Sequence, residues 1–342
     1  MNSIRSGGAS RGSWNENSGR HTSGAEPWVR HGRPSYQWRV NGPDRAVNYF
    51  WLFSALVPLC LAGSNVIDNY VLHERLDDPV SYDILTTWLT VPVAVAVFLA
   101  WKISFSFEAW FVGTTVGFAF AFLFILYNFA MMKEEGTNVV SLIYTSPLFV
   151  AILALVFLGE QLTLTNYFGI LILIFSAFLV LYKKLDAKNI ALGIILVYAF
   201  FTAAVRVVSK SALESVDVWS YFFWFLVGGI IGTLILAALR PRKLAAAWSR
   251  VDARLLLLLV ATTGLGELGV VLLYSAFSMG SVVLASGLSA VQPTVVYAYS
   301  VVLVRIRPGI IPAEGTFGKW AGARRIAAVI LIILGALALT GT

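Results

Sequence analysis

Charged residues, cysteine and histidine are all scarce in this sequence. Only 13% of its 342 residues are Asp, Glu, Lys or Arg, whereas 58% are hydrophobic. A soluble domain usually carries about 25% charged residues, so this chain cannot cover a water-facing surface of its size. The shortage excludes a large soluble enzyme, a disordered regulator and a nucleic-acid-binding module. It predicts a polytopic membrane protein, whose first partner is the lipid bilayer.

The rare residues also exclude most metal and cofactor chemistry. Cys60 is the single cysteine, so neither an intrachain disulfide nor a cysteine metal cluster can form. His21 and His31 lie near the N-terminus, and His73 belongs to a loop between hydrophobic runs. These runs contain no paired carboxylates, no HExxH zinc motif and no P-loop. We therefore expect no metal site, no cofactor and no intramembrane enzyme.

The first 47 residues hold most of the net charge. They contain seven arginines and three acidic residues, which accounts for +4 of the formal +7. The segment is rich in Ser, Gly and Asn, so it cannot bury enough apolar surface to offset the entropy of ordering. It also lacks the apolar core of a signal peptide. We expect residues 1–47 to form a disordered basic tail.

Ten hydrophobic stretches follow the tail. A membrane core of about 30 Å requires about 20 apolar residues in a helix. The stretches that meet or approach this length are 49–71, 82–101, 109–132, 137–158, 165–182, 190–209, 218–239, 255–279, 281–304 and 326–342. The predicted fold class is an all-α membrane protein with ten transmembrane helices.

The ten stretches contain an internal repeat. Tyr127 precedes Pro147 by 20 residues, and Tyr274 precedes Pro293 by 19 residues. A Ser-Tyr dipeptide also opens both the second and the seventh stretch. These correspondences predict two repeats of five helices each.

The boundary between the repeats divides the chain into a first half, residues 48–188, and a second half, residues 189–342. Because each half has an odd number of helices, the second half inserts upside down relative to the first. Inverted repeats recur in secondary transporters, which bind substrate where the halves meet. Two repeats in one chain make a monomer sufficient, and a dimer is the alternative.

Pro147 and Pro293 lie in the middle of the fourth and ninth stretches. Each removes a backbone hydrogen bond and frees a carbonyl about one turn earlier, which in a membrane must face protein or a cavity. The matched pair therefore indicates a central site, and the alternative is two packing kinks without ligand contact. Further polar groups at this depth are candidate lining residues: Tyr127, Asn128, Tyr144, Tyr274 and Gln292.

Glu267 lies near the middle of the stretch 255–279. A carboxylate at this depth costs about 2.5–3.5 kcal/mol on insertion scales, so such residues usually face a cavity or a partner. We predict that Glu267 binds a proton or another cation. The alternatives are a structural ion pair with Arg206 or Lys210 and a protonated donor between helices.

Arg206 precedes Lys210 by four residues, so both project from one helix face. They could hold an anionic substrate or extend to the membrane interface, and we expect the latter for Lys210. Asp68 lies late in the first stretch, where we expect it to be in water.

Glycines recur at spacings that allow helices to pack closely. The pairs are Gly113 with Gly117 and Gly228 with Gly232, and a third group lies within 264–269. We interpret them as packing residues.

The segment 141–184 resembles a known family. It reads SLIYTSPLFVAILALVFLGEQLTLTNYFGILILIFSAFLVLYK and combines a Pro-containing helix, a Leu-Gly-Glu turn ending at Glu160, and a following helix that contains Gly169. In these motifs the chain resembles the drug/metabolite transporter superfamily, specifically its ten-helix EamA-type members. The second half matches more loosely, with Ile306 at the place of Glu160. We expect Glu160 to close a turn.

The resemblance implies a multi-pass transporter of the cytoplasmic membrane. The implied activity is export of small organic metabolites or drugs by alternating access, with protons as the candidate coupling ion. An exchanger of anionic metabolites, such as sugar phosphates or nucleotide sugars, is the first alternative, and it requires Arg206 inside the cavity. A channel or a non-transporting scaffold is the second.

Two arguments about orientation disagree. The resemblance places both termini in the cytoplasm. Lys and Arg near the ends of the stretches number six on the side of the N-terminus and fifteen on the opposite side, and such residues usually stay in the cytoplasm.

Overall fold

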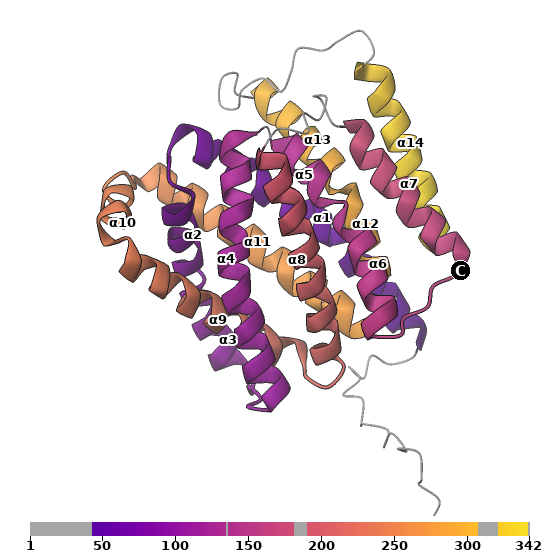
Figure 1. Cartoon of the computed structure of the whole chain (residues 1–342), viewed down its shortest axis with the longest axis horizontal. Helices are drawn as coiled ribbons and strands as arrows, with labels where there is room; N and C mark the ends of the chain where they lie inside the picture. Colours follow the sequence, from indigo (N-terminus) through magenta and orange to yellow (C-terminus); the bar gives the residue numbers. More distant parts are fainter. Residues whose placement is uncertain (1–42, 135, 181–189, 307–320, 341–342) are drawn as a thin grey trace, which may run out of the picture. The chain divides into compact units, whose positions relative to one another are not determined.

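The computed structural model of the chain describes residues 43–134, 136–180, 190–306 and 321–340, and every regular element in this part is helical (Figure 1). Nearly all of the predicted basic tail lies outside the described residues, as does the connection 307–320. The first helix begins at Pro43, within the last few residues assigned to the tail.

The first half contains one unbroken long helix followed by several interrupted ones. Its elements are α1 (Pro43–Glu74), α2 (Pro79–Trp88), α3 (Val91–Ala100), the π-helical η1 (Glu108–Val112), α4 (Gly113–Lys133), α5 (Gly136–Ile143), α6 (Ser146–Phe157) and α7 (Leu164–Val180). A turn at Leu89 and Thr90 divides the predicted second stretch into α2 and α3, with Pro92 in the first turn of α3. Proline is favoured at this place because the first backbone N–H groups of a helix have no partner inside it.

The second half follows the same order. Its elements are α8 (Ile190–Leu213), α9 (Val218–Leu239), α10 (Pro241–Trp248), α11 (Ala253–Met279), α12 (Val282–Leu288), the 3₁₀ turn η2 (Ser289–Val291), α13 (Gln292–Ile306) and α14 (Ala321–Thr340). The short helix α10 was not predicted. It falls in a basic connection between two stretches.

Eight helical segments of the described chain are long and apolar enough to cross a membrane. They coincide with the predicted first to fourth and sixth to ninth stretches. The predicted fifth and tenth stretches correspond to shorter apolar helices, Leu164–Ser176 in α7 and Ala327–Leu339 in α14. The all-helical architecture of the described residues is thus confirmed, and eight of their segments are candidate membrane spans by length and composition.

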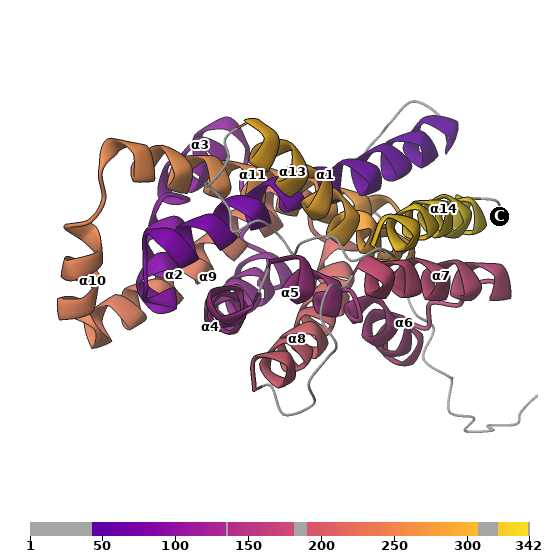
Figure 2. The same ribbon diagram turned by 90° about the horizontal axis from the view of Figure 1, so that it is seen from above.

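Helices of the two halves pack against each other in matched pairs. The first helix of each half contacts the third stretch of the other half, since α1 packs on α11 and α8 packs on α4. Each first helix also contacts the interrupted stretch of the other half, as α1 lies against α13 and α8 against α6. The last helices, α7 and α14, lie side by side in both views (Figures 1 and 2). This exchange of contacts is the arrangement expected of two repeats.

Glycines bring α4 and α9 into direct backbone contact, as predicted. A Cβ atom added to Gly117 would lie 1.9 Å from the Phe225 carbonyl oxygen, and one added to Gly228 would lie 2.1 Å from the Thr114 carbonyl oxygen. No side chain fits at either place. In the third predicted group, a Cβ on Gly269 would lie 2.6 Å from the Leu61 Cδ2 atom of α1, whereas a Cβ on Gly264 would meet nothing within 4 Å.

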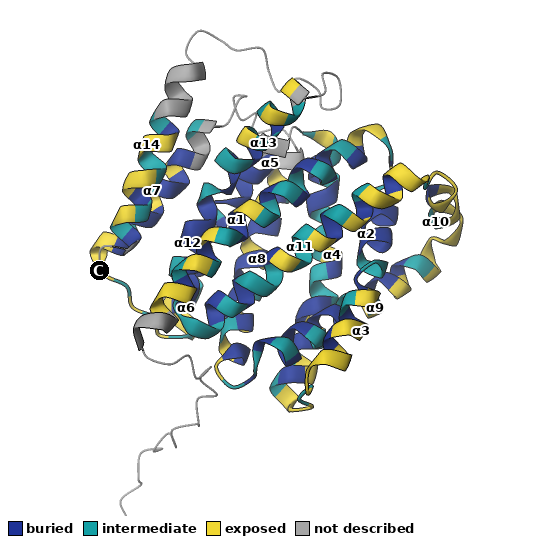
Figure 3. Cartoon of the chain, turned by 180° about the vertical axis from the view of Figure 1, so that it is seen from behind, coloured by how far each residue is buried: buried dark blue, intermediate teal, exposed yellow. Residues whose placement is uncertain are grey.

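Large apolar side chains cover the outer faces of the helices. Leu99, Phe157, Leu257 and Leu337 are all exposed, and Figure 3 shows exposed bands along α7, α11 and α14. A water-soluble protein rarely exposes apolar surface this extensive. The acyl chains of a bilayer would cover it.

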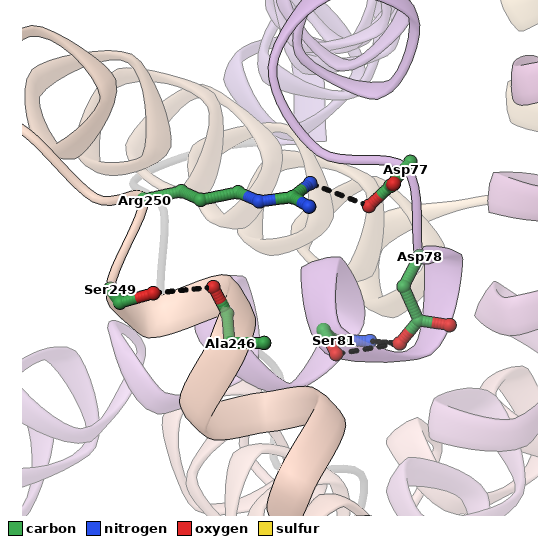
Figure 4. A network of polar contacts seen from close by, with 6 residues as sticks. All are labelled: Asp77, Asp78, Ser81, Ala246, Ser249 and Arg250. Carbon is green, nitrogen blue, oxygen red and sulfur yellow. Dashed lines mark hydrogen bonds and ion pairs between the residues drawn. The ribbon is translucent and has the colours of Figure 1, made fainter.

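The same helix cap opens the second stretch of each half. The Asp78 carboxylate accepts a hydrogen bond of 3.0 Å from the Ser81 amide at the start of α2 (Figure 4). The Asp217 carboxylate accepts one of 2.9 Å from the Ser220 amide at the start of α9. Each cap satisfies an amide that has no partner inside its helix, and the duplicated Ser-Tyr dipeptide marks its position.

Among the described residues, three ion pairs join the two halves at one end of the helices, and the longest has the Arg240 guanidinium 3.6 Å from the Asp78 carboxylate. The Arg250 guanidinium lies 2.8 Å from the Asp77 carboxylate (Figure 4). The Arg75 guanidinium lies 2.7 Å from the Asp252 carboxylate. Hydrogen bonds from the Leu255 amide and from Arg75 lower the pKa of Asp252 below its usual value. We call these contacts the loop ion pairs.

Candidate transport site

The two interrupted helices meet at their breaks. Tyr144 lies in the two-residue turn between α5 and α6, and Gln292 is the first residue of α13, directly after η2. The Tyr144 hydroxyl donates a hydrogen bond to the Gln292 side-chain oxygen. Pro147 and Pro293 are the second residues of α6 and α13. Both prolines are buried, and the residues that precede them, rather than the prolines, face the space between the helices.

This space is a cavity of about 120 Å³, which we call the central cavity. Both halves line it. Five predicted site residues are among its lining residues: Tyr127, Tyr144, Arg206, Tyr274 and Gln292. The sequence did not suggest the other polar lining residues, which are Asn65, Tyr198 and Thr202.

Arg206 gives the central cavity a positive charge. The side chain is 8% exposed, and its Nη1 atom has no hydrogen-bond partner among the described residues. None of the described residues that line the central cavity is acidic. A buried guanidinium with an unused donor is suited to bind an oxyanion or another acceptor.

A second cavity, of about 130 Å³, lies next to the first. It is lined by Asp68, Asp83 and Glu267, and we call it the carboxylate cavity. Four apolar residues line both cavities and therefore separate them: Leu61, Phe120, Phe225 and Val270. The predicted site residues thus fall into two neighbouring compartments, with Glu267 in one and Arg206 in the other.

Asp68 is buried at the junction of four helices, so the prediction that it lies in water is wrong. It is 2% exposed. Hydroxyl groups of Tyr82, Tyr127 and Ser64 donate to it at 2.5, 3.1 and 3.5 Å, and Thr262 of α11 donates as well. Its depth follows from the length of α1, which continues to Glu74 and so places Asp68 well inside the helix.

Glu267 and Asp83 are the carboxylates without such donors. Atom Oε2 of Glu267 and atom Oδ2 of Asp83 are buried and have no hydrogen-bond partner among the described residues. Glu267 forms no ion pair with Arg206 or Lys210. The Lys210 ammonium instead donates a hydrogen bond of 2.8 Å to the Phe277 carbonyl oxygen.

A duplicated tyrosine anchors the first helix of each half. Tyr82, at the start of α2, donates to Asp68 of α1. Tyr221, at the start of α9, donates a hydrogen bond of 2.8 Å to Ser209 of α8. The acceptor is therefore a carboxylate in the first half and a hydroxyl group in the second. In the sequence the Ser-Tyr dipeptide served as evidence of the repeat, and these contacts were not predicted from it.

Two further residues lie away from both cavities. Asn128 is fully buried and lines neither of them, and its side-chain amide has no partner among the described residues. Glu160 closes the turn after α6, as expected. Its amide donates to the Ala154 carbonyl oxygen at 3.2 Å, and Gly159 supplies the left-handed backbone conformation (φ 66°) that this turn requires.

Comparison with other proteins agrees with this architecture. A protein of known crystal structure is similar in fold, with a TM-score of 0.62 over 87% of this chain and 97% of the other, at 18% sequence identity. No curated protein matches the chain. The model of the EamA-like transporter family matches residues 51–182 and 189–323, once in each half. Because these two matches cover most of its length, the chain belongs to the EamA-like transporter family of membrane proteins.

Proposed function

We propose that the chain is a secondary active transporter that exports small organic metabolites or drugs across the cytoplasmic membrane by alternating access. The observation that carries the proposal is the central cavity, which both halves line at the meeting point of two interrupted helices. Backbone that leaves the helical conformation at membrane depth is tolerated where it is buried in protein or lines a cavity. In secondary transporters such breaks form the substrate site.

In this proposal, ten helices cross the membrane. Eight long apolar helices, together with α7 and α14, give each half five crossings, so that the second half is inverted relative to the first. The matched contacts between the halves support this count. The two halves are then the units that rock around the central cavity.

The size of the cavity supports a mechanism with moving halves. Its volume of about 120 Å³ is below the roughly 300–1,000 Å³ of a typical ligand pocket. A metabolite therefore enters only when the halves separate on one side. The loop ion pairs join the halves at one end, and separation at that end breaks them.

Glu267 supplies the coupling step in this proposal. Its carboxylate lies near the middle of α11, with one buried oxygen unpartnered among the described residues. Such a group takes up a proton when its cavity opens to the acidic side and releases it on the other side. Protonation removes a buried charge that is costly in a membrane.

The test is transport by the purified full-length chain in proteoliposomes. A thermal-shift screen against amino acids, sugars, nucleotides and cationic drugs selects the probe, whose flux is then followed under an imposed proton gradient. We expect saturable, gradient-dependent flux that falls at least tenfold in Arg206→Ala and Gln292→Ala. The control is Glu214→Gln, an exposed carboxylate after α8, which should transport normally. Flux that rises linearly with concentration would indicate a channel, and no flux for any stabilising compound would indicate a scaffold.

Glu267→Gln separates coupling from binding. The variant should still exchange labelled for unlabelled probe across the membrane, because exchange requires no net proton movement. It should lose accumulation against a gradient. A variant that accumulates the probe normally at every pH contradicts the coupling role.

A second candidate function is the exchange of anionic metabolites, and the position of Arg206 favours it. The guanidinium lines the central cavity with no acidic side chain beside it in the lining. Counterflow between two phosphorylated sugars, lost in Arg206→Ala and absent for neutral sugars, would establish this function in place of export.

A further inference from the structure

The polar side chains that line the carboxylate cavity all end in oxygen. They comprise three carboxylates, six Ser or Thr hydroxyl groups and one Tyr hydroxyl group, with no nitrogen donor among them. The central cavity differs, because Asn65, Arg206 and Gln292 place side-chain nitrogen atoms there. Oxygen-only surroundings are typical of sites for hard cations.

These oxygens converge from three helices. On α2, Asp83 is followed at positions three and four by Thr86 and Thr87, a spacing that places the three residues on one helix face. Thr90 lies in the turn after α2, and all four residues line the cavity. Asp68 of α1 and Glu267 of α11 line the cavity from the other helices.

The three carboxylates of this cavity differ in how many hydrogen-bond donors they have. Asp68 has four hydroxyl donors. Asp83 is only 1% exposed, and its Oδ2 atom has no hydrogen-bond partner among the described residues. The buried Oε2 atom of Glu267 likewise has no hydrogen-bond partner among them. A buried carboxylate without a compensating partner is costly. The unpaired oxygens of Asp83 and Glu267 therefore require positive charge from outside the chain.

We infer that the carboxylate cavity is a binding site for a small monovalent cation, held chiefly by Asp83 and Glu267 with hydroxyl groups of α2. Among the described residues, no three acidic, cysteine or histidine side chains lie close enough together to hold a metal ion. That spacing argues against a tightly coordinated divalent ion. A volume of about 130 Å³ leaves room for an alkali ion that keeps part of its hydration shell, or for a small primary ammonium group. Binding in this cavity does not depend on the proposed export, whereas co-transport of the cation does.

The test compares cations at fixed pH and ionic strength. The thermal unfolding of the full-length chain in detergent is measured in chloride salts of Na⁺, K⁺, methylammonium and choline. We expect a saturable rise of the unfolding midpoint with at least one of the first three cations, because a ligand that binds only the folded state stabilises it. Choline, a bulky quaternary ammonium, should give no rise. Preference for Na⁺ or K⁺ identifies an alkali site, and preference for methylammonium identifies an amine site.

Variants locate the site. Asp83→Asn and Glu267→Gln should each weaken the apparent affinity for the effective cation at least tenfold. Thr87→Val, which keeps every charge, should weaken it by a smaller factor and serves if Asp83→Asn does not fold. Glu214→Gln, on the exposed surface, is the matched control and should respond as the unmodified chain does.

Two outcomes overturn the inference. One is an unfolding midpoint that is the same in all four salts, which would mean that protons alone neutralise the cavity. The other is an unchanged cation response in both Asp83→Asn and Glu267→Gln. Either result, combined with normal flux in proteoliposomes, would leave the proposed export intact.

Discussion

At the scale of single residues, Asp68 has the largest structural role. Its carboxylate accepts hydrogen bonds from Ser64, Tyr82, Tyr127 and Thr262, which belong to four helices and to both halves. A charged acceptor with several donors forms hydrogen bonds about twice as strong as those between neutral groups. The residue therefore joins α1 to its neighbours.

Asp68→Ala should destabilise the protein strongly. Each buried donor left without an acceptor costs about 1–3 kcal/mol. Three of the hydroxyl groups that donate to Asp68, those of Tyr82, Tyr127 and Thr262, belong to helices other than α1. The free energy of unfolding in detergent should therefore fall by about 3 kcal/mol or more. Asp77→Ala is the comparison, because it removes an exposed ion pair, which is typically worth about 0–1 kcal/mol. An equal loss of unfolding free energy in the two variants would show that the hydrogen bonds of Asp68 contribute no more to stability than an exposed ion pair.

The lowered pKa of Asp252 predicts how the stability of the protein depends on pH. Because the Leu255 amide and Arg75 lower the pKa of Asp252 in the folded protein, its stabilising effect is complete above the unfolded pKa of about 4. That effect disappears as the pH falls through the lower pKa of the folded state. The unfolding midpoint of Asp252→Asn should therefore be lower than that of the unmodified chain at pH 6, and the two should converge near pH 3. Parallel pH profiles would contradict the assignment.

At the scale of helices, the contact between α4 and α9 is fixed by backbone rather than by side chains. Gly117→Ala should cost about 1–3 kcal/mol or more, the usual penalty of overpacking, because the added methyl group would lie 1.9 Å from a carbonyl oxygen. Gly264→Ala is the matched control on α11, where nothing lies within 4 Å of the added atom. Thermal unfolding of the two variants measures the difference. A Gly117→Ala protein as stable as the Gly264→Ala protein would show that the helices can separate freely.

The positions of the helices along the sequence were easier to predict than which helices pack against one another. Hydrophobic length located the helical stretches, and Pro147 and Pro293 located two of the breaks, because length and proline act within a single segment. The break at Leu89 between α2 and α3 and the short α10 were missed. The first has the same local signal, Pro92 in the first turn of α3, which the prediction did not use. The short α10 lies in a basic connection, where no long hydrophobic run marks a helix.

The candidate site was predicted where a charge in an apolar stretch or a proline in mid-stretch gave a signal. Glu267 and Arg206 stood out as charges in apolar stretches, and the structure places both on cavities. Asp83 was overlooked because it lies near the start of a stretch, where a charge normally marks the water boundary. Asp68 was misplaced because it lies near the end of a stretch, where the same rule applies. Only the packing of α1 against α11 shows that these positions are enclosed.

At the scale of the whole molecule, the loop ion pairs are the contacts that alternating access would have to break. Each joins a residue between α1 and α2 to a residue near α10 of the other half. Exposed pairs are worth about 0.2–1 kcal/mol each, so their loss shifts a conformational equilibrium by a few fold without unfolding the protein. Their weakness suits a contact that forms and breaks in every cycle.

Charge reversal tests this role. Asp77→Arg alone and Arg250→Asp alone should each place like charges together and shift the protein toward the form that is open at this end, by about two- to fivefold for up to 1 kcal/mol. The double variant restores an ion pair with its polarity reversed and should restore the equilibrium. Fluorescence transfer between labels on the α1–α2 loop and on α10 measures the separation. Double and single variants with the same separation would contradict the assignment.

None of the described residues that line the carboxylate cavity is basic, and this has an electrical consequence. The charge of a cation bound there is balanced only by carboxylates. These carboxylates themselves take up protons or release ions during a transport cycle. If that ion crosses with the moving halves, the turnover of the carrier moves net charge through the transmembrane voltage. Each elementary charge then couples to about 2.3 kcal/mol per 100 mV. The direction of transport would be set by the membrane potential as well as by the concentration of the cargo, and the carrier would be electrogenic.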